Sequence, residues 1–288
     1  MTQITDLVPA EKAPAAADRN AAARSETPAR SASAGRLLRR VGARIFVLAI
    51  TVALWWLLAD VLFADNPVVS HMGPGTTLQA LFAQAGDTAF LDAISVSLGR
   101  LLGGLGIALA IGVPLGILFG SREPVEDAVN PIVQFLRMTS PLAWAPLAIV
   151  LLGAGTGAVI ALVALAAVWP IVLGVAAGVR ALDPGLRRVA RSLGATRWEA
   201  FRSTALPALT SPIVGATRVA LGISWVVLVP AEMLGVPNGL GYAVLNARDN
   251  IDYAGLAAVM LTIGILGFLL DRILRGLHRL VDTREVRG

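Results

Sequence analysis

The sequence predicts an all-α membrane protein with six transmembrane helices and an amphipathic helix-bend-helix segment between the fourth and the fifth helix. The first observation behind this prediction is composition: the 288 residues are 56% hydrophobic and only 15% charged, and the mean hydropathy is +0.73. Soluble domains carry about 25% charged residues. The second observation is a series of apolar runs, each long enough for a helix to cross a hydrocarbon core of roughly 30 Å.

Charge and residue usage exclude several classes of function. The sequence pI is about 10.8, but the basic residues lie in terminal tails and short loops, without the interleaved aromatic residues of a nucleic-acid interface. There is no cysteine, and His71 and His278 are far apart, so we expect no disulfide, metal cluster or cofactor. Lys12 is the only lysine, which rules out a phosphate-binding G-x-x-x-x-G-K-[S/T] loop in this chain.

Apolar runs and their interruptions define the six expected spans. No charged residue occurs from Met138 to Val179, a stretch too long for one helix, and the glycine-rich residues 153–157 divide it. A glycine stands at every fourth position from Gly112 to Gly120, which would let a neighbouring helix approach closely. The spans are expected at residues 45–63, 96–119, 130–152, 158–178, 208–234 and 253–270.

Charge distribution predicts the regions outside the membrane and the orientation. Residues 1–40 are rich in Ala, Arg, Ser and Pro and are expected to form a disordered arm, residues 41–280 the membrane domain, and residues 281–288 a tail. No lysine or arginine lies between Arg44 and Arg100, whereas six arginines lie in residues 180–202. We therefore expect a multi-pass protein of the cell (inner) membrane. By the positive-inside tendency, the arm, the tail and the arginine-rich segment lie on its cytoplasmic side.

The segment Asp183 to Pro207 begins with a short amphipathic helix. Asp183 and the proline after it suit an N-cap and a first helical turn. Apolar residues then recur at i, i+3, i+4 and i+7 from Leu186 to Leu193, with arginines on the opposite face. Gly194 is expected to end this helix in the left-handed conformation.

A second short helix is expected directly after the bend at Gly194. Thr196 and Glu199 form an S/T-x-x-E capping box, and Trp198 and Phe201 lie on one side of the helix that follows. From the residues alone, such a pair of helices suits either contact with a partner or a position flat on the bilayer surface.

These residues resemble the cytoplasmic coupling loop of the membrane permease subunits of ATP-binding-cassette (ABC) importers, written E-A-A-x-x-x-G-x9-I-x-L-P. Arg188-Val189-Ala190, Gly194 and Thr204-Ala205-Leu206-Pro207 occupy the matching positions, with arginine in place of the glutamate and threonine in place of the isoleucine. The run GATRWEAF and the segment Gly222–Tyr242 resemble the nitrate, sulfonate and taurine branch of these permeases. The resemblance extends over about residues 90–280.

The resemblance implies a function and a set of partners. The chain would be a homodimeric permease subunit that forms the path of a small solute, most similar to the permeases for an aliphatic sulfonate, taurine or a nitrate-like anion. An extracytoplasmic solute-binding protein would deliver the solute, and two copies of a separate cytoplasmic ATPase would hydrolyse ATP, so this chain is not expected to be an enzyme. The positions that match the loop and would contact the ATPase or bend are Arg188, Val189, Ala190, Gly194, Ala195, Phe201, Leu206 and Pro207.

A few charged or aromatic residues within the spans are candidates for the translocation path or a subunit interface. Arg218, Trp225 and Glu232 follow one another at intervals of seven, so they share one face of the fifth span. We expect this face to turn toward the subunit interior or a dimer interface, because an arginine facing lipid at a helix centre costs about 2.5–3.5 kcal/mol. Glu232 suits a structural helix-end partner better than a substrate contact. Arg137 and Arg100 are further candidates, expected to snorkel or to bridge helices.

Three alternatives remain open from the sequence. A permease of the same family could carry a heterocyclic vitamin precursor. A self-sufficient secondary transporter would be expected to show an inverted repeat, and none is evident. An enzyme is the least favoured alternative, because no H-E-x-x-H, G-x-S-x-G or S-x-x-K arrangement is present.

Overall fold

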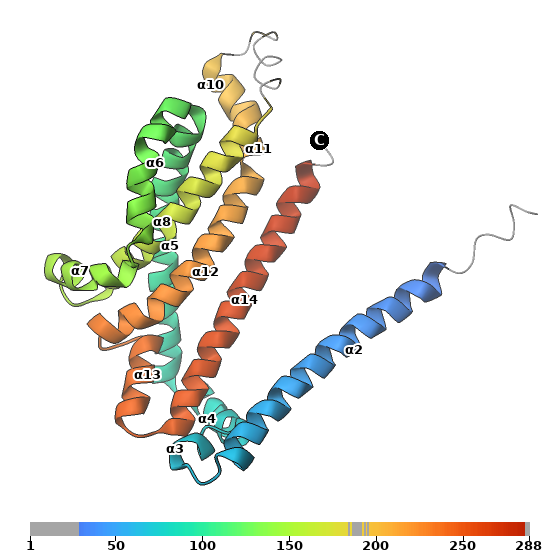
Figure 1. The fold of residues 1–288 in the computed structure, drawn as a ribbon, viewed down its shortest axis with the longest axis vertical. Coiled ribbons are helices and arrows are strands. Elements are labelled where there is room, and N and C mark those ends of the chain that lie inside the picture. Colours follow the sequence, from blue (N-terminus) through green and yellow to red (C-terminus); the bar gives the residue numbers. More distant parts are fainter. Residues whose placement is uncertain (1–28, 184, 186–191, 193, 195, 286–288) are drawn as a thin grey trace, which may run out of the picture.

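The computed structural model describes residues 29–183, 185, 192, 194 and 196–285, and within them every regular element is a helix (Figure 1). The long helices are α2 (Ala29–Trp56), α5 (Thr88–Ser121), α6 (Glu123–Met138), α8 (Thr156–Ala181), α12 (Thr210–Gly235) and α14 (Tyr253–Glu285). The shorter elements are η1 (Leu57–Leu62), α3 (Pro67–Ser70), α4 (Pro74–Ala85), η2 (Pro141–Trp144), α7 (Ala145–Leu152), α10 (Arg197–Ala200), η3 (Phe201–Ala205), α11 (Leu206–Ala208) and α13 (Leu240–Asp249).

Among the described residues, five helices are long and apolar enough to cross a membrane, and a bent pair brings the number to six if it counts as one span. The bent pair is the expected third span, and it is not one straight helix. Its halves, Pro131–Met138 and Pro141–Leu152, meet at an angle of 82°. Pro141 accounts for the break, because the residue before a proline is kept out of the helical conformation, and Ser140 has ψ 127°.

Several helix ends differ from the expected boundaries. α2 begins at Ala29, inside the region expected to be a disordered arm, while residues 1–28 lie outside the described residues. α5 begins at Thr88 rather than near residue 96, because Asp87 caps it: its Oδ1 accepts a hydrogen bond from the backbone N–H of Ala89 at 3.0 Å. α14 continues to Glu285, past the expected end of the sixth span. The first turns of α5 and the last turns of α14 are polar, so a prediction based on hydropathy did not include them in the helices.

The core of the bundle is α8, which packs between α5 and α12. In the apolar 18-residue stretch of α8, 61% of the residues are buried. In the corresponding stretch of the first span, Gly42–Leu62, only 6% are buried. Glycines permit the close approach, as expected for the series from Gly112 to Gly120. A Cβ added to Gly116 of α5 would lie 2.7 Å from the Cβ of Val175, and one added to Gly174 of α8 would lie 2.6 Å from the Cβ of Ala216.

The first helix stands apart from this core. Figure 1 shows α2 leaning away from the bundle, next to α3 and α4 at one end only. The indole Nε1 of Trp55 donates a hydrogen bond to the carbonyl of Met72 at 3.0 Å. Large apolar side chains along α2, such as Phe46 and Leu54, are more than half exposed. This surface suits lipid or another membrane-embedded chain.

Candidate functional site

The described second half of the segment, formed by α10, η3 and α11, lies at one end of the bundle (Figure 1), and Gly194 before it has the geometry expected of the bend. Gly194 has φ +81°, in the left-handed region. Oε2 of Glu199 accepts hydrogen bonds from the backbone N–H and the hydroxyl of Thr196, both at 2.8 Å, and Oγ1 of Thr196 accepts from the N–H of Glu199 at 3.3 Å. These bonds from Thr196 hold the pKa of Glu199 below its ordinary value.

The second half of the segment exposes apolar side chains. Trp198 is 68% exposed and Leu206 is 42% exposed, and Pro207 is exposed as well. Leu209, two residues after the end of the segment, is 1% exposed and belongs to the main core. The segment therefore exposes an apolar ridge formed by Trp198 and Leu206, while the chain directly after it is anchored in the bundle.

The structure places only part of the residues that match the family loop. Gly194, Leu206 and Pro207 are described, and Phe201 begins the element η3. The positions Arg188, Val189, Ala190 and Ala195 lie outside the described residues.

A buried ion pair joins two spans at the opposite end of the bundle. Nη1 of Arg100 lies 2.8 Å from Oε1 of Glu232, and the two side chains are 1% and 0% exposed. Arg100 also donates to the carbonyl of Asn238 at 2.9 Å and to the hydroxyl of Thr156 at 3.1 Å. Arg100 therefore bridges helices, as expected, and does not snorkel.

The second carboxylate oxygen of Glu232, Oε2, accepts hydrogen bonds from α5 and from the start of α13. Oε2 accepts from the N–H of Gly241 at 2.9 Å and from the hydroxyl of Ser97 at 2.8 Å, and the Ser97 oxygen accepts from the N–H of Leu240. Gly239 takes φ +99°, and a Cβ there would lie 2.6 Å from Oε1 of Glu232. The pair thus fixes the loop before α13 onto α5, α8 and α12.

Arg218 and Trp225 of α12 lie against α14, whereas Glu232 of the same helix pairs with Arg100 of α5. Nε of Arg218 lies 2.7 Å from Oδ1 of Asp271 in α14, with side chains 38% and 30% exposed. Trp225 packs over Gly267 of the same helix, where an added Cβ would lie 2.7 Å from the indole Nε1. Both residues therefore contact α14 and neither lines a large cavity.

Arg137, the fourth candidate, lies at a cavity. Its lining comes from the end of α6, the break before η2, the middle of α8 and the first half of α12, and its volume is about 640 Å³. The lining is mostly apolar, and Arg137 is its only charged member. No hydrogen bond or ion pair joins Arg137 to any described residue. The guanidinium therefore keeps all its donors for solvent or a ligand.

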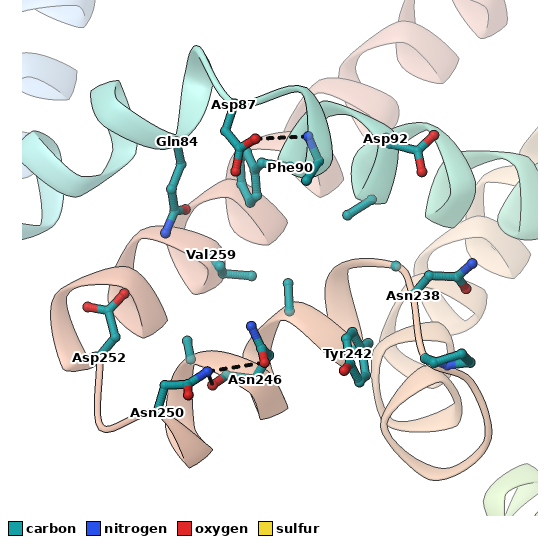
Figure 2. A pocket seen from close by; sticks show the side chains of 16 residues that line it. Gln84, Asp87, Phe90, Asp92, Asn238, Tyr242, Asn246, Asn250, Asp252 and Val259 are labelled. Atoms are coloured by element: carbon teal, nitrogen blue, oxygen red, sulfur yellow. Dashed lines mark hydrogen bonds between the residues drawn. The ribbon is translucent and has the colours of Figure 1, made fainter.

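A second cavity, of about 410 Å³, opens at the end of the bundle that holds α13. Figure 2 shows Asp87, Asp92 and Asp252 around it together with the amides of Asn246 and Asn250. Asp87 and Asp252 are engaged as helix caps, since they accept from the N–H groups of Ala89 and Gly255. No basic residue lines this cavity, so it does not suit an anion.

Comparison with known protein families identifies the family of this chain. The family described as "binding-protein-dependent transport system inner membrane component" matches residues 112–287, which include the bent pair, the helix-bend-helix segment and the last two spans. The chain belongs to this family. It is a permease component of an ABC importer of the nitrate and taurine type, and not an enzyme.

Relatives of this permease carry different named substrates. The taurine transport system permease protein TauC of Escherichia coli (strain K12) is 32% identical over 248 residues, covering 84% of this chain and 90% of TauC. The nitrate import permease protein NrtB of Synechocystis sp. is 34% identical, covering 67% of this chain and 70% of NrtB. The bicarbonate transport system permease protein CmpB of Synechococcus elongatus is 35% identical, over 64% of this chain and 66% of CmpB.

Among solved structures, a chain of the MetNI methionine ABC transporter in inward-facing conformations has the same fold. The TM-score is 0.57 at 21% identity, and the match covers 67% of this permease and 96% of that chain. At this identity the likeness concerns the fold alone.

Residue-level reasoning missed the network around the ion pair. Asn238, Ser97 and Thr156 contribute to it from a loop, from α5 and from the start of α8. An arginine near the start of one span and a glutamate near the end of another were visible in the sequence, but 132 residues separate them, and no local pattern links them.

Proposed function

We propose that this permease imports a small organic or oxyanionic solute, of the class of aliphatic sulfonates, taurine and nitrate-like anions, delivered by an extracytoplasmic solute-binding protein. The observation that carries the proposal is the exposed apolar side chains of Trp198 and Leu206 in the described second half of the segment, at one end of the bundle of a chain that belongs to the binding-protein-dependent family. The names of relatives that transport taurine, nitrate and bicarbonate support an anionic substrate.

The two ends of the bundle differ in charge, which supports a cytoplasmic position for the segment. Arg180 lies in the last turn of α8, shortly before the segment, and Arg202 lies in η3, within it. At the opposite end the loops and caps carry Asp65, Asp87 and Asp252. By the positive-inside tendency the end with the segment and the C-terminal part of α14 faces the cytoplasm, where an ATPase is accessible.

Energy transfer in this proposal passes from a separate ATPase to the segment and then to the bundle. Trp198 and Leu206 provide apolar contacts for a groove on the ATPase, and Gly194 provides the bend. We assign contact or bending roles also to Arg188, Val189, Ala190, Ala195, Phe201 and Pro207. ATP-driven closure of two ATPase copies would then reorient the helices of a permease homodimer.

The arrangement is tested by purification from membranes. An affinity-tagged chain is expected to co-purify with an ATPase, and in proteoliposomes the ATPase activity is expected to rise when a solute-loaded binding protein is added. A panel of taurine, nitrate, bicarbonate and alkanesulfonates identifies the substrate. Gradient-driven uptake by the purified chain alone would instead establish a secondary transporter and overturn the proposal.

A further inference from the structure

The cavity that contains Arg137 combines one unpaired cation with an apolar wall. Its apolar lining includes Leu165, Trp169 and Leu173 of α8 and Val219 and Ile223 of α12. Its volume of about 640 Å³ lies within the range of roughly 300–1,000 Å³ typical of small-molecule sites. Such sites are mostly apolar, with few polar groups that fix the orientation of the ligand.

The position of Arg137 argues against a purely interfacial role. It is the penultimate residue of α6, directly before the break between Met138 and Pro141. Figure 1 shows the junction of α6 and α7 near mid-height of the bundle, away from both ends. An arginine at membrane depth must face protein or water rather than lipid. Arg137 is exposed and pairs with no described carboxylate, so its charge is open to water or to an anion that enters the cavity.

The apolar wall restricts which anions fit. A bare oxyanion such as nitrate would use the guanidinium but leave the faces of Trp169 and the leucines in contact with water. An anion with a hydrocarbon body would satisfy both parts of the cavity. Each buried methylene then adds about fourfold in affinity, the equivalent of the usual transfer free energy.

We propose that this cavity is a transit site within the permease that selects monoanions bearing an apolar body of several carbons, with Arg137 holding the sulfonate or carboxylate head. The proposal rests on the proposed function, because it assumes that the solute passes along α6, α8 and α12. It places part of the selectivity in this chain rather than only in the solute-binding protein.

Equilibrium binding to the purified full-length chain in lipid nanodiscs tests the site without any ATPase. The probes are alkane-1-sulfonates of two to six carbons. Nitrate is the control that has a negative charge without a hydrocarbon chain, and hexylammonium is the control that has the chain with a positive charge. Affinity is expected to rise about fourfold per methylene, and nitrate and hexylammonium are expected not to compete. Equal binding of hexylammonium would mean partition into lipid, and equal binding of nitrate would mean a site that reads charge alone; either result overturns the proposal.

Two variants locate the binding in the cavity. Arg137→Gln is expected to weaken hexanesulfonate binding at least tenfold, whereas Arg248→Gln, which changes an exposed arginine in the last turn of α13, should leave it unchanged. Gly215→Leu fills the cavity from α12, where an added Cβ meets no atom within 4 Å, and should abolish binding. Gly222→Leu makes the same change on the same helix, also in open space but outside the cavity, and should bind normally.

Access to the cavity is tested by cysteine labelling, since the natural chain has no cysteine. Val219→Cys at the cavity wall should react with a membrane-permeant maleimide, and hexanesulfonate should slow the reaction. A cysteine that is unreactive in the ligand-free chain, or joined to a second copy by oxidation, would mean that another chain fills the cavity and would overturn the site. Binding without ATPase co-purification would contradict the proposed function alone, and co-purification without binding would contradict the transit site alone.

Discussion

Arg100 and Glu232 lie 132 residues apart in the chain, yet their charged atoms meet at 2.8 Å with both side chains almost fully buried. Their remaining hydrogen-bonding atoms are occupied by Ser97, Asn238 and the backbone of Gly241. A buried pair with this degree of satisfaction is costly to break from one side, because the surviving charge has no water to solvate it.

Breaking the pair from one side should therefore destabilise the permease strongly. Arg100→Met or Glu232→Met is expected to lower the free energy of unfolding by about 3–5 kcal/mol, and the double variant should recover a large part of that loss. Unfolding of the detergent-solubilised protein, followed by tryptophan fluorescence, measures both. Arg248→Met removes a pair that is 59% and 65% exposed, and should cost no more than about 1 kcal/mol. Additive losses in the double variant would contradict the coupling.

Close packing of α5 on α8 predicts opposite effects for two glycine substitutions on one helix. Gly116→Ala places a Cβ 2.7 Å from the Cβ of Val175 and 2.8 Å from the carbonyl of Val172, so overpacking should cost about 1–3 kcal/mol. Gly106→Ala meets no atom within 4 Å and should instead stabilise the helix by roughly 0.5–1 kcal/mol. The shift of the unfolding midpoint in detergent checks the sign of each effect.

We expect substitutions at the bend of Gly194 to affect transport without affecting folding or membrane insertion. Proline cannot take the φ of +81° found there, so Gly194→Pro should abolish uptake and the stimulation of the partner ATPase while membrane insertion stays normal. Asparagine tolerates this conformation, and Gly194→Asn should keep most of the activity. A charged residue at Ala195 should also abolish uptake. Uptake that survives Gly194→Pro and the charge at Ala195 would remove the segment from the mechanism.

The contact between Arg218 and Asp271 predicts a modest structural role for both residues. Because their side chains are partly exposed and solvent weakens their attraction, Arg218→Gln or Asp271→Asn should each shift the unfolding midpoint far less than Arg100→Met does. Substrate preference in a competition assay with reconstituted transporter should not change. A changed preference would return Arg218 to the translocation path.

Much of the fold follows from hydropathy and from a few local signals. The apolar runs predicted the positions of the long helices, and the capping box of Thr196 and Glu199 forms as its spacing indicates. The break at Ser140 was missed because residues 130–152 taken together are apolar enough for one span, although Thr139 and Ser140 stand directly before Pro141.

The site was less accessible to prediction than the fold. Arg137 could be noticed as a charge in an apolar region, but its cavity depends on how α6, α8 and α12 pack, which no spacing along the chain encodes. The spacing of Arg218, Trp225 and Glu232 predicts one shared face of α12, and the role of that face in the translocation path or a dimer interface stays a prediction. The partners of that face on α5 and α14 are long-range contacts that only the structure supplies.

The anchoring of Leu209 has a mechanical consequence. This residue joins the exposed ridge to the core, and its side chain lies beside Gly178 of α8, where an added Cβ would be 3.6 Å from it. Helices held backbone to backbone by glycines leave little slack to absorb a displacement. A displacement of Trp198 and Leu206 by a partner would therefore be expected to reach α8 with little loss, and through its packing on α5 and α12 to reach the loop that the Arg100–Glu232 pair holds.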